Sequence, residues 1–364
     1  MRVLHVTQPT EAGVANVIMA LIKDQIARGW QVQLACPPTP GDLPERAREH
    51  GAEVHAWPAT RSPGPGILQE CRSLSRILGR AEPDVVVLHA SKAGLAGRLC
   101  LRGRVPTVFM PHSWSFEAVQ GAVALASQLW EGLAARWTTL DVLVSEGERE
   151  TGRRARCLAR RSVVIPNGVD VDRWARRDQD LARSDLGLSQ DPLVVLVGRL
   201  ARQKGQDVAL GAWPLVRQAH PSAQLVMVGD GPDKERLQRD LVEGASLQPG
   251  GDSHPWFSAA DLVIMPSRWE GMPLVLLEAM ACGRCVVASD VAGVREVMGE
   301  SDAIVPVEDE VALAAQISRR LADDDLRRAE GERNAQRVAA AFDVRDTTAQ
   351  MAHHLLELAG ARST

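Results

Sequence analysis

Two glutamates in the second half of the chain, Glu270 and Glu278, combine residue type and position in a way that could do chemistry. Glu270 follows the apolar run 262–265 after a short loop, and Glu278 lies in the helical pattern Pro273–Ala281, whose first position suits proline. The start of a helix carries free backbone N–H groups that attract an anion or sugar hydroxyls. The candidate groups are those of Met272, Leu274 and Val275. Glu278 lies one turn beyond Leu274 on the same face, which predicts a site for a polyhydroxyl ligand that carries phosphate.

Both glutamates also have a structural interpretation. Glu270 could cap the helix, and Glu278 could be a solvated charge. The neighbours of Glu278 are Leu276, Leu277, Ala279 and Met280. A carboxylate in such an apolar helix needs a partner, because isolated buried charges are very costly. The pattern therefore favours ligand binding over a solvated face.

A second candidate site lies in the loop 198–206, which follows the apolar run 193–197. Its glycines let the backbone approach a phosphate, and Arg199 and Lys204 can neutralise a departing diphosphate. The spacing is not that of a P-loop, and an exposed basic turn is the alternative. The loop 228–232, Val-Gly-Asp-Gly-Pro, is a weaker indication of a nucleotide site.

The first half of the chain holds two weaker candidates. Gly13 lies in a loop that follows the strand-like run Arg2–Thr7 and opens a helix. His112 lies just past the strand-like run Pro106–Met110. A single glycine is common in turns and a single histidine is often structural, so position alone leaves both roles open.

These candidates depend on a framework of alternating strands and helices. Apolar runs without alternation, such as 85–88, are typical of parallel strands buried on both faces. In the first half we expect strands at Arg2–Thr7, Gln31–Cys36, Glu53–Trp57, Asp84–His89, Pro106–Met110, Leu140–Ser145 and Ser162–Ile165. We expect helices there at Val14–Arg28, Gly66–Arg80 and Glu117–Trp137.

The second half repeats the alternation. We expect its strands at Leu193–Val197, Gln224–Val228, Leu262–Met265, Cys285–Ala288 and Ala303–Val305. We expect its helices at Asp207–Ala219, Lys234–Glu243, Pro273–Ala281, Val311–Ala322, Asp324–Phe342 and Arg345–Leu358.

The pattern predicts an α/β protein of two Rossmann-like, doubly wound lobes with a boundary near Pro166. The domains are expected at 1–165 and 166–342, with a C-terminal helix over 343–364 that packs back on the first domain. Ligands of such sheets bind outside the carboxyl ends of the strands, which predicts a ligand cleft where the two lobes face each other.

Composition limits the classes of function. A chain of 364 residues exceeds one ordinary core, and a net charge of −4 gives no reason to expect nucleic acid as a partner. The N-terminus lacks a secretory pattern, and no apolar stretch approaches the ~20 residues that span a bilayer. We therefore expect a cytoplasmic protein with reduced cysteines. The pair Cys282-x-x-Cys285 is expected to mark a helix end that enters a buried strand, rather than a metal site.

Taken together, these residues resemble family 4 of the retaining glycosyltransferases, which have the two-lobed GT-B fold. The resemblance covers nearly the whole chain and is most specific in the segments 198–205, 229–232 and 261–296. The run 166–170 resembles the usual inter-lobe sequence, and 91–98 is similar to members that build bacterial cell-surface polysaccharides.

The resemblance implies a nucleotide-diphosphate sugar donor, with UDP favoured, a hydroxyl-bearing acceptor, retention of anomeric configuration, and no metal ion or other cofactor. Glu270 and His112 would contact the donor sugar at the reacting centre. Glu278 would accept hydrogen bonds from the ribose hydroxyls. Arg199 and Lys204 would hold the diphosphate in place of a metal ion. In such enzymes the leaving phosphate takes the acceptor proton, so no carboxylate pair like that of a glycosidase is needed.

In the first lobe the resemblance implies that Gly13 leaves room for the donor phosphate. Three positions depart from the family pattern. Asn16 stands where many members carry a basic residue, which would weaken the phosphate contacts there, and Cys285 replaces a frequent proline. The stretch Gly244–Trp256 is short for the strand and glycine turn that usually hold the base, so the identity of the base stays open.

Other functions fit parts of this pattern. A nucleotide-sugar epimerase or a phosphorylase of the same two-lobed fold is the nearest enzyme alternative. A non-catalytic, two-lobed binding protein for small ligands would share the architecture but would normally carry a secretory signal. A nicotinamide-dependent dehydrogenase is disfavoured, because Gly-x-Gly-x-x-Gly is missing after the first strand.

Basic and aromatic residues of the first lobe raise the hypothesis of peripheral contact with the inner face of an anionic membrane, near a lipid-linked acceptor. These residues are Arg153, Arg154, Arg156, Arg160, Arg161, Trp114, Phe116, Trp130 and Trp137. A solvated face over core tryptophans is the alternative.

Overall fold

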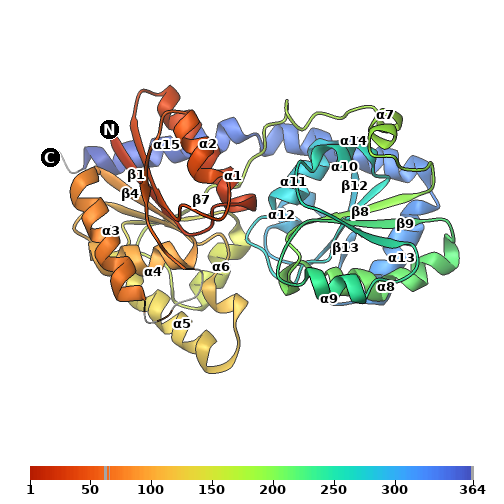
Figure 1. Ribbon diagram of the computed structural model, residues 1–364, viewed down its shortest axis with the longest axis horizontal. Coiled ribbons are helices and arrows are strands. Elements are labelled where there is room, and N and C mark those ends of the chain that lie inside the picture. The colour runs from red at the N-terminus through yellow and green to blue at the C-terminus, as the bar shows by residue number, and fades with distance from the viewer. Residues whose placement is uncertain (61–63, 65, 362–364) are drawn as a thin grey trace. The chain divides into compact units, whose positions relative to one another are not determined.

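The computed structural model (Figure 1) describes residues 1–60, 64 and 66–361. It divides into two compact units, residues 1–167 with 345–364, and residues 168–344. Each unit is a parallel β-sheet with helices on both faces, the predicted doubly wound α/β architecture.

The first unit has seven strands in the order β3-β2-β1-β4-β5-β6-β7. They are β1 (Arg2–Thr7), β2 (Gln31–Cys36), β3 (Glu53–Ala56), β4 (Val85–His89), β5 (Thr107–Met110), β6 (Leu140–Leu143) and β7 (Ser162–Val164). All seven were predicted, with differences of up to two residues at their ends. The order places β1, β4 and β5 side by side, so the residues at their carboxyl ends meet at one edge of the sheet.

The helices of this unit are α1 (Ala12–Ala27), α2 (Leu43–Glu49), α3 (Ile67–Ala81), α4 (Ala90–Leu101), α5 (Gly121–Ala134) and α6 (Glu146–Arg154). The prediction of one helix over Glu117–Trp137 is wrong. A 3₁₀ turn, η1 (Ser115–Ala118), comes first, two extended residues follow, and α5 is closed by η2 (Ala135–Trp137). The reason is that the carboxylate of Glu117 accepts the N–H of Trp114 at 3.0 Å and so caps η1 instead of continuing a helix.

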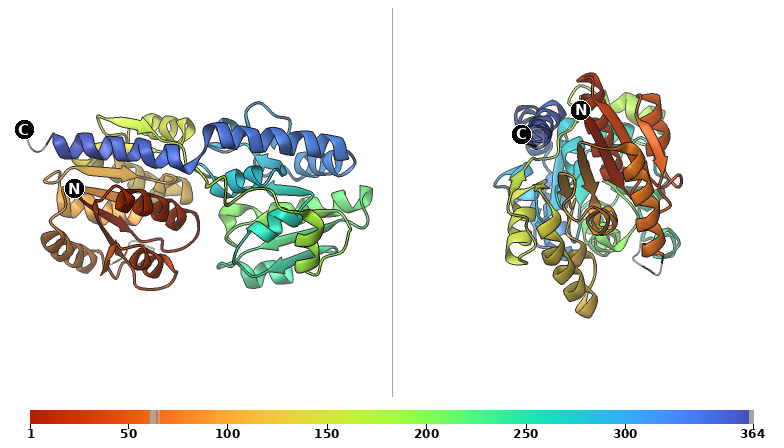
Figure 2. Two further views of the ribbon diagram at one scale, coloured as in Figure 1. Left: turned by 90° about the horizontal axis from the view of Figure 1, so that it is seen from above. Right: turned by 90° about the vertical axis from the view of Figure 1, so that its left-hand side faces the viewer.

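Helix α15 (Val344–Gly360) packs on the first unit, and Figure 2 shows it running along that unit. Thr347 Oγ1 donates to the carbonyl of Pro166 at 2.8 Å, and Arg161 pairs with Glu357 at 3.3 Å. The last residues of the segment predicted over 343–364, residues 362–364, lie outside the described part of the chain.

The second unit has six parallel strands in the order β10-β9-β8-β11-β12-β13. They are β8 (Leu193–Val197), β9 (Gln224–Val228), β10 (Ala245–Gln248), β11 (Leu262–Met265), β12 (Cys285–Ser289) and β13 (Ile304–Val305). The stretch Gly244–Trp256, which is short for a strand and a glycine turn, nevertheless contains the strand β10. The strand pairs with β9 over four residues and is followed by Gly250 and Gly251.

The helical segments of this unit are α7 (Gln179–Asp185), η3 (Arg202–Lys204), α8 (Gln206–Ala219), α9 (Lys234–Arg239), α10 (His254–Ala259), α11 (Leu274–Ala281), α12 (Val294–Met298), α13 (Glu310–Leu321) and α14 (Asp324–Ala341). Helix α9 ends at Arg239 and is shorter than the predicted Lys234–Glu243; the chain then turns at Gly244, whose φ is +75°, to enter β10. Pro273 is the N-cap residue of α11 and not its first helical residue, since its ψ of 118° is extended.

Both sheets have apolar cores of the expected kind. In the first unit, one cluster around Leu4 and Leu88 lies under α3 and α4, and another around Leu34 lies under α1 and α2. In the second unit, a cluster around Val194 and Ile264 lies under α8, α9 and α13. Cys282 is the C-cap residue of α11 and Cys285 begins β12, and both are buried, so the pair marks a helix end that enters a buried strand, as predicted. Within the described residues, no helix is both long enough and apolar enough to cross a membrane.

One buried ion pair joins α4 to α5 in the first unit. Arg98 and Glu131 lie 2.5 Å apart, and each side chain is at most 2% exposed. The guanidinium of Arg98 also donates to the carbonyl of Gly94 at 2.8 Å and lies 3.9 Å above the ring of Phe109. Glu131 accepts a further hydrogen bond from Ser115 at 3.1 Å. Both charges are therefore fully matched inside the protein.

Removing only the carboxylate strands a buried guanidinium. We expect Glu131→Ala to lower the free energy of unfolding by about 3–5 kcal/mol, and the double variant Arg98→Met/Glu131→Leu to lose less, because it leaves no unpaired charge. Urea denaturation followed by circular dichroism measures both. As a control, Arg153→Ala breaks an exposed pair with Glu150 and is expected to leave the midpoint nearly unchanged. A double variant less stable than Glu131→Ala would contradict this account.

Candidate functional site

Two loops of the second unit meet at the carboxyl ends of β8 and β11. Gly205 has a φ of +67°, and a Cβ there would lie 2.0 Å from the carbonyl oxygen of Pro266, so only glycine fits. The loops are joined by hydrogen bonds from the N–H of Arg268 to the carbonyl of Gln203 at 2.7 Å and from the Gln203 amide to the carbonyl of Trp269 at 3.0 Å. The contact fixes the side chains that follow on each loop.

Lys204 and Glu270, predicted from separate motifs, are brought together by this contact. Lys204 Nζ lies 2.5 Å from Glu270 Oε1, and the side chains are 18% and 8% exposed. Arg199, on the same loop as Lys204, differs: within the described parts of the chain its guanidinium has no hydrogen-bond or ion-pair partner. The loop after β9 packs equally closely, since Gly229 abuts the carbonyl of Gly198.

Glu278 is the predicted residue whose environment is most unusual. It is 7% exposed, and its carboxylate forms no hydrogen bond or ion pair with any residue that the structure describes. Burial raises the pKa of Glu278 from its ordinary value of 4.5 to about 7, while the charges of Arg173 and Lys204 oppose that shift and Asp252 adds to it. A buried carboxylate without a partner is the arrangement expected of a group that waits for a ligand.

The start of α11 carries the backbone groups predicted for an anion. Since Pro273 is the N-cap, Leu274 and Val275 are the first two helical residues, and their N–H groups donate to no described residue. Leu276 instead donates to the carbonyl of Pro273 at 3.2 Å. Met272 is buried in the preceding turn, 4% exposed. The helix can thus offer two backbone donors to a ligand.

In the first unit, His112 lies directly after β5 in a strained backbone. Its φ is +55° and that of the next residue, Ser113, is +109°. Glu148 holds this turn: its carboxylate accepts the N–H of Ser113 at 2.6 Å and that of Val144 at 2.8 Å. Strain that is held by buried partners is common at functional sites. Glu148 was missed from the sequence, because nothing in α6 marks it apart from the exposed acids around it.

Gly13 lies in the first turn of α1 rather than in the preceding loop, and it is exposed. On the next turn, Asn16 accepts hydrogen bonds from both terminal nitrogens of Arg46 at 3.3 Å. A cation from α2 therefore stands beside Asn16, where the family pattern has a basic residue. Sequence reasoning missed Arg46, because α2 was not predicted.

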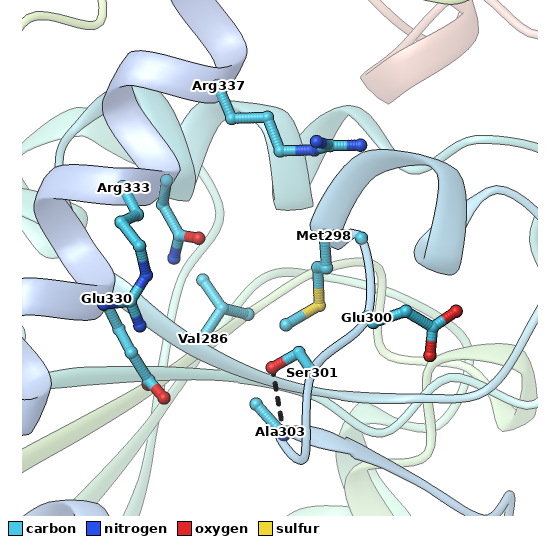
Figure 3. A pocket seen from close by; sticks show the side chains of 10 residues that line it. Val286, Met298, Glu300, Ser301, Ala303, Glu330, Arg333 and Arg337 are labelled. Atoms are coloured by element: carbon cyan, nitrogen blue, oxygen red, sulfur yellow. Dashed lines mark hydrogen bonds between the residues drawn. The ribbon is translucent and has the colours of Figure 1, made fainter.

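A pocket of about 340 Å³ lies elsewhere in the second unit, beside α12 and α14 (Figure 3). None of the predicted site residues lines it. Two of its lining side chains cap backbone: Arg337 donates to the carbonyls of Val297 and Glu296, and Asn334 donates to the carbonyl of Arg284. We therefore assign this pocket a structural role and base the candidate site on the loops described above.

Among the described residues, one cluster has the composition of a metal site: His353, His354 and Glu357 of α15. It is largely exposed, and Glu357 already pairs with Arg161. It contains none of the predicted site residues.

Two family models match parts of the chain. A family model described as Glycosyl transferases group 1 matches residues 191–323, and one described as Glycosyltransferase Family 4 matches residues 12–173. Alpha-maltose-1-phosphate synthase of Mycolicibacterium smegmatis is 28% identical, covering 98% of each chain. D-inositol 3-phosphate glycosyltransferase 1 of Catenulispora acidiphila is 32% identical over 77% of this chain and 75% of its own.

Among solved structures, that of Anabaena HepE in complex with UDP-glucose superposes with a TM-score of 0.84 at 23% identity, over 98% of this chain and 100% of its own. The chain has two parallel-sheet lobes, matches two family models and is 32% identical to the Catenulispora relative over 75% of that protein. The chain therefore belongs to glycosyltransferase family 4 and is a glycosyltransferase of the GT-B fold.

Proposed function

We propose that this glycosyltransferase moves a sugar from a UDP-sugar to a hydroxyl group of an acceptor, with retention of anomeric configuration and without a metal ion. The observation that carries the proposal is the buried, unpartnered carboxylate of Glu278, in the same unit as the Lys204–Glu270 pair. UDP is favoured over other nucleotides because the structurally similar Anabaena protein holds UDP-glucose.

In this proposal the nucleotide half of the donor uses the unpaired groups. Glu278 accepts hydrogen bonds from the ribose hydroxyls, which repays the cost of its burial. Arg199 and Lys204, together with the N–H groups of Leu274 and Val275, hold the diphosphate. Two cations and a helix start supply the positive charge that the leaving group needs, so no metal ion is required.

The sugar half uses Glu270 and His112. When Lys204 binds the diphosphate, its ion pair with Glu270 weakens. The carboxylate of Glu270 stays in the same loop and can then accept hydrogen bonds from the hydroxyls of the donor sugar. It also stabilises the positive charge that develops at the anomeric carbon. The bond from that carbon to the phosphate oxygen breaks, the acceptor oxygen bonds on the same face, and the leaving phosphate takes the acceptor proton. In the first unit, Gly13 leaves room for the donor phosphate and Arg46 binds it.

The donor site is tested by thermal shift with UDP, GDP and UDP-glucose, in the presence of EDTA. A ligand that binds only the folded state at a hundred times its Kd adds about 2.7 kcal/mol of stability. We expect UDP and UDP-glucose to raise the Tm of the native protein, and Glu278→Ala and Arg199→Ala to abolish the shift. The matched control is Arg202→Ala, because Arg202 lies on the same loop but stacks over Trp269, 5.9 Å from its centroid. Equal shifts in all variants would place the donor elsewhere.

The nearest alternative, a nucleotide-sugar epimerase, is separated by the reaction itself. Incubation with UDP-glucose and no acceptor leaves a transferase's donor intact or slowly hydrolysed, whereas an epimerised sugar in the NMR spectrum would overturn the transferase proposal.

Donor affinity is also expected to depend on pH through Glu278. A carboxylate with a pKa of about 7 in the free protein must be ionised to accept from the ribose, so affinity for UDP-glucose should fall about tenfold from pH 8 to pH 6. UDP-glucose is the right probe, because a terminal phosphate such as that of UDP itself titrates near pH 6. Calorimetry measures the affinity, and Glu278→Gln should bind weakly at every pH. A flat profile in the native protein would contradict the role of Glu278.

The same raised pKa predicts the opposite effect on stability. A carboxyl whose pKa is raised on folding contributes stability below its unfolded value, and this contribution is lost as pH rises through about 7. The free protein at pH 8 therefore bears a cost on the order of 3 kcal/mol for ionised Glu278. Glu278→Gln should raise the unfolding midpoint of the free protein at pH 8 while it weakens donor binding.

We further propose that the acceptor is lipid-linked and that α5 lies on an anionic membrane. Four side chains on this helix are between 42% and 66% exposed: Val123, Leu125, Leu129 and Leu133. Arg156, exposed, lies against α5 at Gly132, and the exposed Arg136 follows its end. An apolar helix face with arginines beside it matches the chemistry of an anionic lipid surface.

The structure corrects the residues that were expected to make this contact. Trp114 is 1% exposed and belongs to the core, so it cannot reach a membrane. Arg153 and Arg154 are paired with Glu150. The leucines of α5, which the sequence reasoning did not single out, take their place.

Flotation with vesicles that contain phosphatidylglycerol tests this contact. We expect the native protein to float at low salt, and Leu125→Ser/Leu129→Ser to reduce the bound fraction at least fivefold, since each leucine contributes about 1.5–3 kcal/mol when buried in lipid. Leu68→Ser on α3, with a leucine that is 67% exposed, is the matched control and should still float. Absence of native binding would reject the membrane and favour a water-soluble acceptor.

A further inference from the structure

Three histidines of the first unit form one hydrogen-bonded row that ends at His112. His112 Nε2 lies 3.1 Å from His89 Nδ1, and His89 Nε2 lies 2.9 Å from His5 Nδ1. His5 Nε2 in turn lies 2.8 Å from Gln25 Oε1. The rings stack, with centroids 5.2 and 5.4 Å apart. The row crosses three adjacent strands, because His5 lies in β1, His89 ends β4 and His112 follows β5.

The inner members of the row are buried, His112 at its outer end is half-buried, and the row is electrically neutral. His5, His89 and Gln25 are at most 1% exposed. Burial lowers the pKa of His5 and of His112 to about 4, and that of His89 well below its ordinary value. At neutral pH each ring therefore carries one proton, so that each has one donor nitrogen and one acceptor nitrogen.

In a row of neutral imidazoles, all hydrogen bonds point either toward one end of the row or toward the other. The residue at the inner end, Gln25, selects one of these two directions. Gln25 turns its carbonyl oxygen to the row, while its Nε2 is buried without a partner within the described structure. His5 must then donate from Nε2 and accept at Nδ1. His89 donates from Nε2 to His5 and accepts at Nδ1, and His112 donates from Nε2 to His89. The remaining nitrogen, Nδ1 of His112, is left with a lone pair.

We propose that Gln25, His5 and His89 are positioning residues that fix His112 as the Nε2–H tautomer, so that His112 Nδ1 accepts a hydrogen bond from a hydroxyl of the donor sugar. This inference rests on the proposed function for the contact with the sugar, but the tautomer itself is a property of the free protein. It makes His112 a specificity-determining group: it selects a sugar with a hydroxyl, a hydrogen-bond donor, at that position. A sugar that lacks this hydroxyl leaves a buried acceptor unpaired, which is the stronger form of discrimination.

The position of the row also explains why the turn after β5 is held so firmly. The ring of His112 can bond to His89 only while its backbone keeps the positive φ that Glu148 maintains through Ser113. Rotation of this turn would break the hydrogen bond between His89 and His112, and His112 could then adopt either tautomer.

The tautomer is read directly from ¹⁵N NMR of the histidine rings in the free protein, since protonated and bare ring nitrogens differ widely in chemical shift. We expect His112 to be protonated at Nε2 and bare at Nδ1 in the native protein. In Gln25→Met, which keeps the volume but removes the acceptor, His112 should become a mixture of both tautomers. Gln33→Met is the matched control, because Gln33 is another buried glutamine that accepts from a histidine, His55, outside the row. A native His112 protonated at Nδ1 would overturn the inference.

Binding then tests the link to the sugar. By calorimetry, Gln25→Met should weaken UDP-glucose up to about tenfold, the value of one hydrogen bond, and leave the Kd of UDP within twofold. Gln33→Met should change neither. Equal weakening of UDP and UDP-glucose would indicate a merely structural role and reject the inference. If the native protein binds neither ligand, the proposed function fails, while the NMR result still decides the direction of the row.

Discussion

The contact between Gly205 and the carbonyl of Pro266 decides where the charges of the second unit lie. A side chain at position 205 would collide with that carbonyl, so glycine lets two loops that are distant in sequence meet backbone to backbone. The meeting places Lys204 against Glu270, and each then neutralises a charge that would otherwise be costly to bury. Arg199 and Glu278 take no part in this pairing, and neither charged group has a partner among the described residues.

This separation has an energetic meaning. A paired charge stabilises the free protein, and it can bind a ligand only if it gives up its partner. In the proposed function, Lys204 gives up Glu270 for a phosphate in this way. An unpaired buried carboxylate such as Glu278 destabilises the free protein, and a ligand that donates to it recovers that energy as affinity. The candidate site therefore has two different sources of binding energy: the fixed geometry of the loop that carries Lys204, and the electrostatic cost of burying Glu278, which a ligand removes.

The sequence predicted most strands of the two sheets because strands buried on both faces, such as β4, are short apolar runs bounded by turn residues. It missed β10, Ala-Ser-Leu-Gln, whose side chains are all partly exposed and follow no period. It also missed the helices α2, α4, α6, α7, α10 and α12. Glu270 and Lys204 were predicted from their loops, but their pairing was not, since it depends on a contact between distant backbones. His5 and His89 were taken as framework, although a histidine inside two neighbouring apolar strands was a signal that could have been used.

The candidate groups of the two units differ in their chemistry. The second unit presents charges, which suit a diphosphate, act over distance and weaken with salt. The first presents a row of neutral imidazoles, whose interactions are short-ranged, directional and insensitive to salt. Under the proposed function, the charges of Arg199 and Glu278 supply affinity common to any donor with the same nucleotide, whereas Glu270 and the direction of the row supply discrimination among sugars. Under the proposed function, a change of donor sugar during evolution would act on His112 and Glu270, whereas Arg199 and Glu278, which hold the nucleotide half, could remain as they are.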